Sequence, residues 1–192
     1  MQKFLYIFNV KYLGRKKMLG FLKKKENEVK KIELPPLEVD GEKEIICAPM
    51  FGETVPCSEI NELTFQKEML GTSVAIRPLV GEVYAPTDGK IEMLIETLHA
   101  LSITTMGGTE ILIHVGIDTV ALKGKYFKAH VKEGMMVKRG DLLLEFDMKK
   151  ITEAGYDMIS PVIICNTEDY TEIERVIGKP IQVGETIMKL RK

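Results

Sequence analysis

Short apolar runs alternate with turn signals along most of the chain, from about residue 44 to the C-terminus. The runs are rich in Val, Ile and Leu, which favours β-strands over helices. Turns containing glycine or proline separate them at the spacing typical of an all-β sandwich or barrel. The pattern predicts strands over 44–48, 73–78, 81–85, 90–95, 100–104, 110–115, 124–129, 142–146, 162–165 and 186–190.

Two segments, 58–65 and 148–154, are expected to form short helical turns instead. The segments 85–91 and 132–141 resemble the turn-and-strand motifs of biotinyl and lipoyl carrier barrels. Two such half-motifs would close a barrel together and remove exposed strand edges. We predict one all-β domain over 40–192, an antiparallel β-sandwich or barrel built from duplicated hybrid (barrel-sandwich) motifs with short helical turns.

The first 33 residues differ from the rest of the chain in charge. Residues 1–31 contain ten Lys or Arg and two Glu, a net charge of +8, whereas the whole chain carries −1. The apolar stretches 4–13 and 18–22 are each followed by a basic cluster, which suits a segment lying on an anionic membrane surface. A solvated tail and translation starting at Met18 are the alternatives. We predict a flexible, basic, amphipathic N-terminal tail over 1–33.

The remainder of the chain excludes several classes of protein. It carries a net charge of −9, which argues against nucleic acid as a partner because a phosphate backbone requires a basic face. No stretch approaches the ~20 apolar residues needed to cross a bilayer. Cys47, Cys57 and Cys165 are odd in number and lack metal-ligand spacing, so we expect small buried or half-buried thiols and a cytoplasmic protein.

Two histidines, His99 and His114, lie on either side of a glycine pair. Gly107-Gly108 favours a hairpin. A two-residue turn at these glycines places positions that sum to 215 opposite each other, so both imidazoles share one face with α-carbons about 7–8 Å apart. A three-residue loop would instead put them on opposite faces. The predicted proximity of the two rings therefore depends on the register.

The surroundings of these histidines resemble the glucose-type enzyme IIA phosphocarriers of the bacterial phosphotransferase system. The similar segments extend from about residue 45 to residue 190 and occur in the same order as in that family. This resemblance implies that the chain accepts phosphate from the phosphohistidine of the carrier HPr and passes it to a cysteine on the IIB domain of a membrane sugar permease. The matching segments are 48–52, 75–78, 85–89, 97–102, 111–124, 137–141, 145–147 and 160–162.

The residue types suit this chemistry. A phosphate-accepting imidazole is neutral, with one nitrogen free and the other held by a hydrogen bond. The carbonyl of Gly116 is expected to accept from Nδ1 of His114, which leaves Nε2 to attack; the resemblance assigns the same role to this glycine. His99 is expected to donate to the phosphate, and Thr97 to fix the tautomer of His99. No nucleotide loop of the type Gly-x4-Gly-Lys-Ser/Thr is present.

By the same resemblance, a shallow apolar depression around His114 docks the partners and excludes water. Transporters or kinases regulated by the chain are further expected partners. No cofactor is required, but His99 and His114 would hold a zinc ion in a regulatory complex whose partner supplies a carboxylate. The residues expected to bind partners are Leu101, Leu112, Val115, Gly116, Asp118 (toward an arginine of the partner) and Val120.

Two other functions fit single features of the chain. His114 and Asp118 have the His-x3-Asp spacing of some β-rich zinc hydrolases, although the further His-x-His pair of those enzymes is absent. The Met148-Lys149 pair resembles the modified lysine of a biotinyl or lipoyl swinging-arm carrier, but 148–154 is expected to be helical rather than a hairpin tip.

Overall fold

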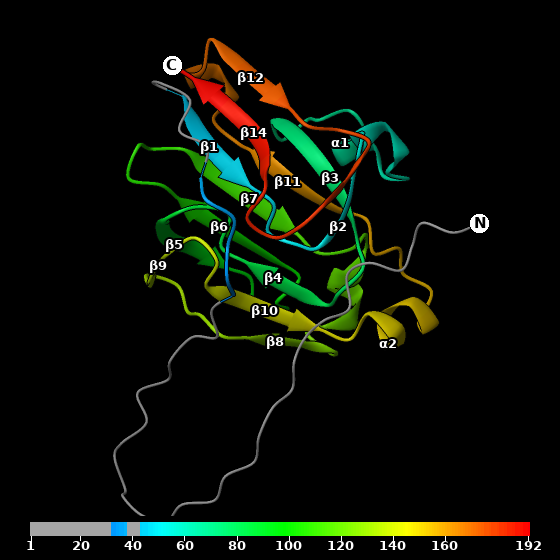
Figure 1. The fold of residues 1–192 in the computed structure, drawn as a ribbon. Helices are drawn as coiled ribbons and strands as arrows, with labels where there is room; N and C mark the ends of the chain where they lie inside the picture. Colours follow the sequence, from blue (N-terminus) through cyan, green and yellow to red (C-terminus); the bar gives the residue numbers. More distant parts are fainter. Residues whose placement is uncertain (1–31, 38–42) are drawn as a thin grey trace, which may run out of the picture.

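The computed structural model describes residues 32–37 and 43–192, whose regular structure is mostly antiparallel β-strand (Figure 1). The largest sheet has the strand order β13-β2-β3-β11-β7-β6-β5-β9. This confirms the predicted all-β class. The bounds are β2 (Gly52–Val55), β3 (Thr72–Pro78), β5 (Gly89–Leu94), β6 (Ala100–Thr104), β7 (Glu110–His114), β9 (Met136–Val137), β11 (Ser160–Ile164) and β13 (Lys179–Ile181).

Two three-stranded sheets complete the sandwich, in the orders β1-β14-β12 and β4-β10-β8. Their strands are β1 (Glu44–Cys47), β4 (Glu82–Tyr84), β8 (Phe127–Ala129), β10 (Leu142–Phe146), β12 (Glu172–Arg175) and β14 (Thr186–Arg191).

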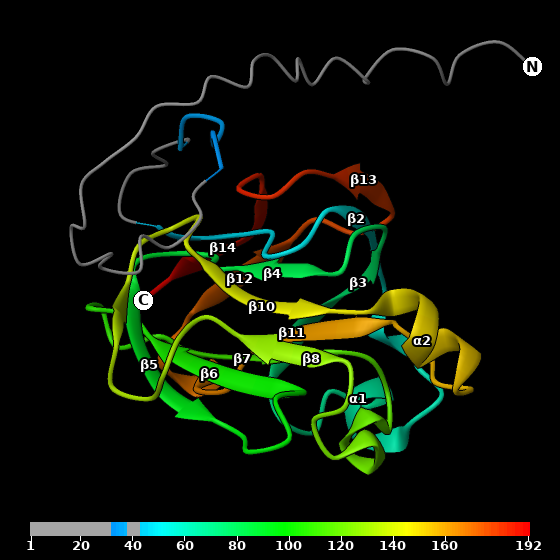
Figure 2. The same ribbon diagram turned by 90° about the horizontal axis from the view of Figure 1, so that it is seen from below.

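The helices are short, as expected, and both predicted helical segments contain one. The α-helices α1 and α2 lie at the same end of the molecule in both views (Figures 1 and 2). No helix among the described residues is long and apolar enough to cross a bilayer. The bounds are η1 (Cys57–Glu59), α1 (Leu63–Gln66), η2 (Thr119–Leu122), α2 (Met148–Glu153) and η3 (Thr167–Asp169).

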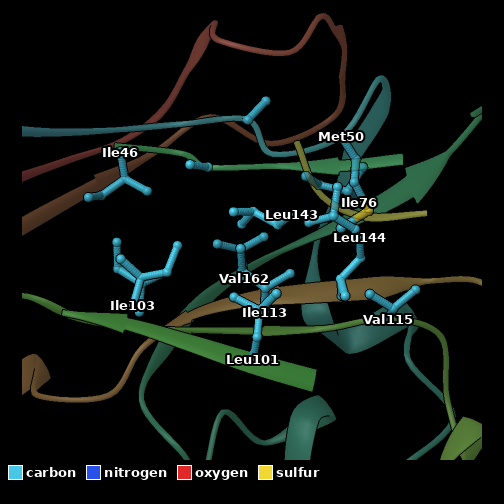
Figure 3. Close-up of a cluster of buried hydrophobic side chains, with 14 of the residues drawn as sticks. Ile46, Met50, Ile76, Leu101, Ile103, Ile113, Val115, Leu143, Leu144 and Val162 are labelled. Carbon is cyan, nitrogen blue, oxygen red and sulfur yellow. The ribbon is translucent and has the colours of Figure 1, made fainter. Parts of the chain in front are cut away.

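The main apolar core lies between the large sheet and the two smaller ones, and Figure 3 shows its centre. A second, smaller cluster lies on the other face of the large sheet. There Phe65 from α1 and Cys57 from η1 pack with Ala75 and Ile163 of the sheet. Alternate residues of the central strands therefore face two different apolar environments, and this decides on which face a side chain lies.

Backbone hydrogen bonds join two Ala-Pro turns of the domain, at 48–49 and 85–86. The Cys47 N–H donates to the Pro86 carbonyl at 3.1 Å, and the Tyr84 N–H donates to the Pro49 carbonyl at 2.8 Å. Each turn thus satisfies a backbone group beside the other. The duplication expected from the sequence related 85–91 to 132–141, and it stays a prediction.

The short segment before the domain packs on this junction. A Cβ at Gly140 or Gly184 would approach the methyl carbons of Leu34 to 2.6 and 2.7 Å, so both glycines make room for that side chain. Arg139 donates from Nη2 to the Pro35 carbonyl at 3.0 Å. Residues 32–37 are therefore attached to the barrel, whereas residues 1–31 of the predicted tail lie outside the described part of the chain.

The three cysteines are free thiols, two of them buried and Cys165 half-buried, as expected from the sequence. Burial raises the pKa of all three.

Candidate functional site

The predicted register of the hairpin between β6 and β7 is wrong by one residue. Leu101 lies opposite Ile113, so partner positions sum to 214 rather than 215. The Thr105 N–H donates to the Thr109 carbonyl at 3.0 Å, which closes a three-residue loop over 106–108. A one-residue shift moves every side chain of a strand to the other face.

The two imidazoles nevertheless meet. The ring centroids of His99 and His114 are 4.8 Å apart, and the ring planes make an angle of 80°. His99 lies in the bend before β6, where Leu98 has a φ of 57°, so strand alternation does not determine the direction of its side chain. The bend brings His99 to the face that His114 occupies at the end of β7.

His114 is held from two sides. Its Nδ1 lies 2.7 Å from the Gly116 carbonyl, which confirms the hydrogen bond expected from the sequence. The Phe65 ring packs against it with a centroid distance of 4.8 Å and a tilt of 56°. The Nδ1 atom is thus the hydrogen-bond donor, and the Nε2 atom carries the lone pair.

His99 is fixed in a similar way. The hydroxyl of Thr97 lies 2.7 Å from its Nδ1, as predicted. The residue is only 6% exposed, whereas His114 is half-buried. Within the described part of the chain, neither Nε2 atom has a hydrogen-bond partner.

Burial is the main cause of a lowered pKa at both rings. For His114 the pKa falls from 6.5 to about 4, and the neighbouring His99 lowers it further whereas the Gly116 carbonyl, Asp118 and Glu62 raise it. Both imidazoles are therefore neutral near pH 7. A neutral ring whose Nε2 carries the lone pair, as in His114, is a nucleophile.

The sequence interpretation missed the contribution of α1. The Glu62 carboxylate accepts hydrogen bonds from the N–H groups of Thr64 and Phe65 at 3.0 and 3.1 Å and so caps this one-turn helix. The cap places Phe65 against His114. The only sequence indication was the short helical turn expected over 58–65, which did not say what it would contact.

The structure contradicts the role expected for two of the six partner-binding residues. Leu101 and Val115 are fully buried in the main core, where Figure 3 shows both. With partner positions that sum to 214, Leu101 shares the inner face with Ile113. They cannot line an exposed depression.

The other four expected residues, in β7 and in the loop and turn that follow it, differ in exposure. Leu112 is half-buried on the same face of β7, and Gly116 is buried. Asp118 is exposed, and Val120 is 51% exposed in η2. Only these last two offer substantial surface to a partner.

The described residues provide neither the zinc ligands of a hydrolase nor the lysine position of a swinging-arm carrier. No group of three or more His, Cys, Asp or Glu side chains among the described residues is arranged to hold a metal ion, whereas a catalytic zinc takes three protein ligands. Lys149 lies on the exposed surface of α2, 3.8 Å from Glu153, rather than at a hairpin tip.

Several known proteins with similar sequences are components of the sugar phosphotransferase system. A family model described as the phosphoenolpyruvate-dependent sugar phosphotransferase system, EIIA 1, matches residues 44–170. The PTS system β-glucoside-specific EIIBCA component of Dickeya chrysanthemi is 43% identical over 147 residues, 77% of this chain and 23% of that protein. The PTS system glucose-specific EIIA component of Halalkalibacterium halodurans is 37% identical over 171 residues, 89% of this chain and 94% of that protein.

A solved structure has the same fold. The glucose permease IIA from Mycoplasma capricolum superposes with a TM-score of 0.74 at 30% identity, covering 80% of this chain and 99% of that one. The chain spans about a quarter of the length of the β-glucoside-specific relatives that it matches.

Proposed function

Because the chain belongs to the EIIA 1 family of the phosphoenolpyruvate-dependent sugar phosphotransferase system, we propose that it is a phosphocarrier that holds a phosphoryl group on Nε2 of His114. The observation that supports this best is the paired geometry of the two imidazoles. Each Nδ1 atom forms a hydrogen bond within the chain, to Thr97 in His99 and to Gly116 in His114, and the ring centroids lie 4.8 Å apart.

The first transfer brings phosphate from the phosphohistidine of HPr. The lone pair on Nε2 of His114 attacks the phosphorus atom, and the bond from phosphorus to the donor imidazole breaks with its electron pair returning to that ring. The proton on Nδ1 stays in its hydrogen bond to Gly116 throughout. Such a transfer depends mainly on positioning and electrostatics.

His99 stabilises the transferred group. With the Thr97 hydroxyl donating to Nδ1, the proton of His99 lies on Nε2, where it can donate to a phosphoryl oxygen. In the second transfer, a cysteine thiolate of the IIB domain of a sugar permease attacks the phosphorus atom. The bond between phosphorus and Nε2 of His114 then breaks, and the lone pair returns to that nitrogen.

The docking surface that the structure supports differs from the one expected from the sequence. Val120, in η2, is 51% exposed, and the exposed Asp118 comes directly before this helix and interacts electrostatically with His114. We place the partners on this mixed apolar and acidic surface. An acidic side chain there would attract a basic partner and raise the rate of encounter.

The test is incubation with phosphoenolpyruvate, enzyme I and HPr, followed by mapping of the acid-labile phosphate. His114→Gln should abolish acceptance, and His99→Gln should accept phosphate but fail to pass it to a IIB domain. His130→Gln is the matched control, since His130 binds Glu145 elsewhere on the barrel. Normal acceptance by His114→Gln contradicts the proposal.

Three further expectations remain proposals: a shared zinc ion, a cytoplasmic location and contact of the basic tail with a membrane. A zinc ion would find two ligands in His99 and His114 and would need a carboxylate from a partner, such as a regulated transporter or kinase. Such a metal would bind only across an interface. A cytoplasmic location and contact of the basic tail with a membrane surface fit the same role.

A further inference from the structure

The carbonyl of Gly116 accepts the hydrogen bond that orients His114, so the residues that hold this carbonyl bear on the chemistry. It belongs to a loop of two successive peptide planes, Val115–Gly116 and Gly116–Ile117. These planes contain four polar groups. The structure gives each of them a partner.

Two buried hydroxyl groups hold the first plane. The Thr119 hydroxyl donates to the Val115 carbonyl at 2.6 Å, and the Gly116 N–H donates to the Ser160 hydroxyl at 3.0 Å. Both Thr119 and Ser160 are fully buried. The plane is thus held at both ends by side chains outside the hairpin.

The second plane is held at one end and points to His114 at the other. The Ile117 N–H donates to the Asp157 carbonyl at 2.8 Å. In a trans peptide the C=O and N–H groups point in opposite directions. The Gly116 carbonyl is thereby directed at Nδ1 of His114, 2.7 Å away.

The segment that holds the loop is itself constrained. The Ser160 hydroxyl donates to the Met158 carbonyl at 2.7 Å, and the Asp157 carboxylate accepts from the Ile159 N–H at 2.9 Å. Gly116 has a φ of 69°, and a Cβ there would lie 2.9 Å from the Asp157 carbonyl oxygen. Only glycine permits this close approach of the two segments.

We propose that Thr119 and Ser160 are positioning residues, which hold the Gly116 carbonyl toward Nδ1 of His114 and so determine which ring nitrogen is free to react. The inference rests on the proposed function for its effect on transfer. Its effect on the tautomer of His114 is measured in the unphosphorylated chain and does not depend on phosphate transfer. Loss of either hydroxyl allows the peptide plane that it holds to move, and the Gly116 carbonyl then turns away from Nδ1 of His114. Because this carbonyl favours the proton on Nδ1, the population of the tautomer with the proton on Nε2 increases.

The test compares Thr119→Val and Ser160→Ala with Thr54→Val and Ser73→Ala in the full chain. Thr54 and Ser73 are buried and hydrogen-bonded, but in β2 and β3, without contact to the loop. Two-bond ¹H–¹⁵N correlation spectra report the tautomer of His114. The hydroxyls act on the Gly116 carbonyl through the neighbouring peptide plane, so the energy of one hydrogen bond sets an upper limit: we expect the tautomer ratio to change by two- to fivefold, roughly, and phosphate acceptance from HPr to slow by a similar factor.

Thr119→Ser, which keeps the hydroxyl, should restore both the tautomer ratio and the rate. An unchanged ratio in both variants, or an equal change in the two controls, overturns the proposal. If Ser160→Ala does not fold, Ser160→Cys, with a weaker hydrogen bond, takes its place under the same two outcomes. Failure of the unsubstituted chain to accept phosphate would contradict the proposed function but not the tautomer result, so the two failures are distinguishable.

Discussion

The lowered pKa of His114 should make the stability of the folded protein depend on pH. In the unfolded chain this imidazole takes a proton as the pH falls below its ordinary pKa of 6.5, whereas in the folded protein it stays neutral until about pH 4. The unfolded state therefore binds more protons in that window. The free energy of unfolding falls as the pH is lowered through it.

The size of the effect follows from the difference in pKa. Each unit corresponds to about 1.4 kcal/mol, so the difference between 6.5 and about 4 is worth roughly 3 kcal/mol in full. That is a large share of the 5–15 kcal/mol typical of a domain, as a rough guide. Above about pH 7 the contribution vanishes because both states are neutral.

Urea unfolding of the unsubstituted chain and of His114→Gln, between about pH 7 and about pH 4.5, measures this contribution. Acid also weakens ion pairs such as Asp147 with Lys150, but this loss is common to both proteins and cancels in their difference. The advantage of the unsubstituted chain should shrink as the pH falls. A difference independent of pH, with the Hε1 resonance of His114 titrating near 6.5, would refute the reasoning.

Three further substitutions test contacts described above. Gly116→Ala should lower the free energy of unfolding by about 2 kcal/mol, more than Gly108→Ala, which has a similar positive φ but open space around it; equal melting temperatures would contradict this. Phe65→Ala should cost about 3 kcal/mol and raise the pKa of the imidazole that it covers, as an NMR titration would show. Leu34→Ala should cost about 1–2 kcal/mol in urea unfolding, whereas Leu37→Ala, at a position 42% exposed, should cost almost nothing, and equal losses would count against the packing of Leu34.

The fold class was predictable because buried strands produce apolar runs that turns interrupt. Edge strands were harder to predict. β12 and β13 carry charged residues and a proline and bury few side chains, so they form no apolar run. Their strand conformation comes from pairing, of β12 with the nearby β14 and of β13 with β2, which is distant in the sequence.

The two histidines and their hydrogen-bond partners Thr97 and Gly116 were predictable from the sequence, but the register of the hairpin was not. Gly107-Gly108 is compatible with loops of two or three residues. The longer loop is favoured by Thr109, which is buried and whose hydroxyl contacts Glu44 and Tyr170. Those partners lie more than 60 residues away in sequence, so no local pattern could reveal them.

The meeting of the histidines depends on a feature that strand alternation does not describe. The bend at Leu98 turns His99 toward His114, and so the rings converge despite the shifted register. Phe65 was missed for a similar reason, since it reaches His114 from a separate segment.

The packing of Leu34 has a consequence for any shortened version of the protein. Leu34 lies against Gly140, in the loop between β9 and β10, and against Gly184, in the loop between β13 and β14. These two loops are more than 40 residues apart in the sequence. Removing residues 32–37 would therefore uncover both loops at once, although neither belongs to the removed segment.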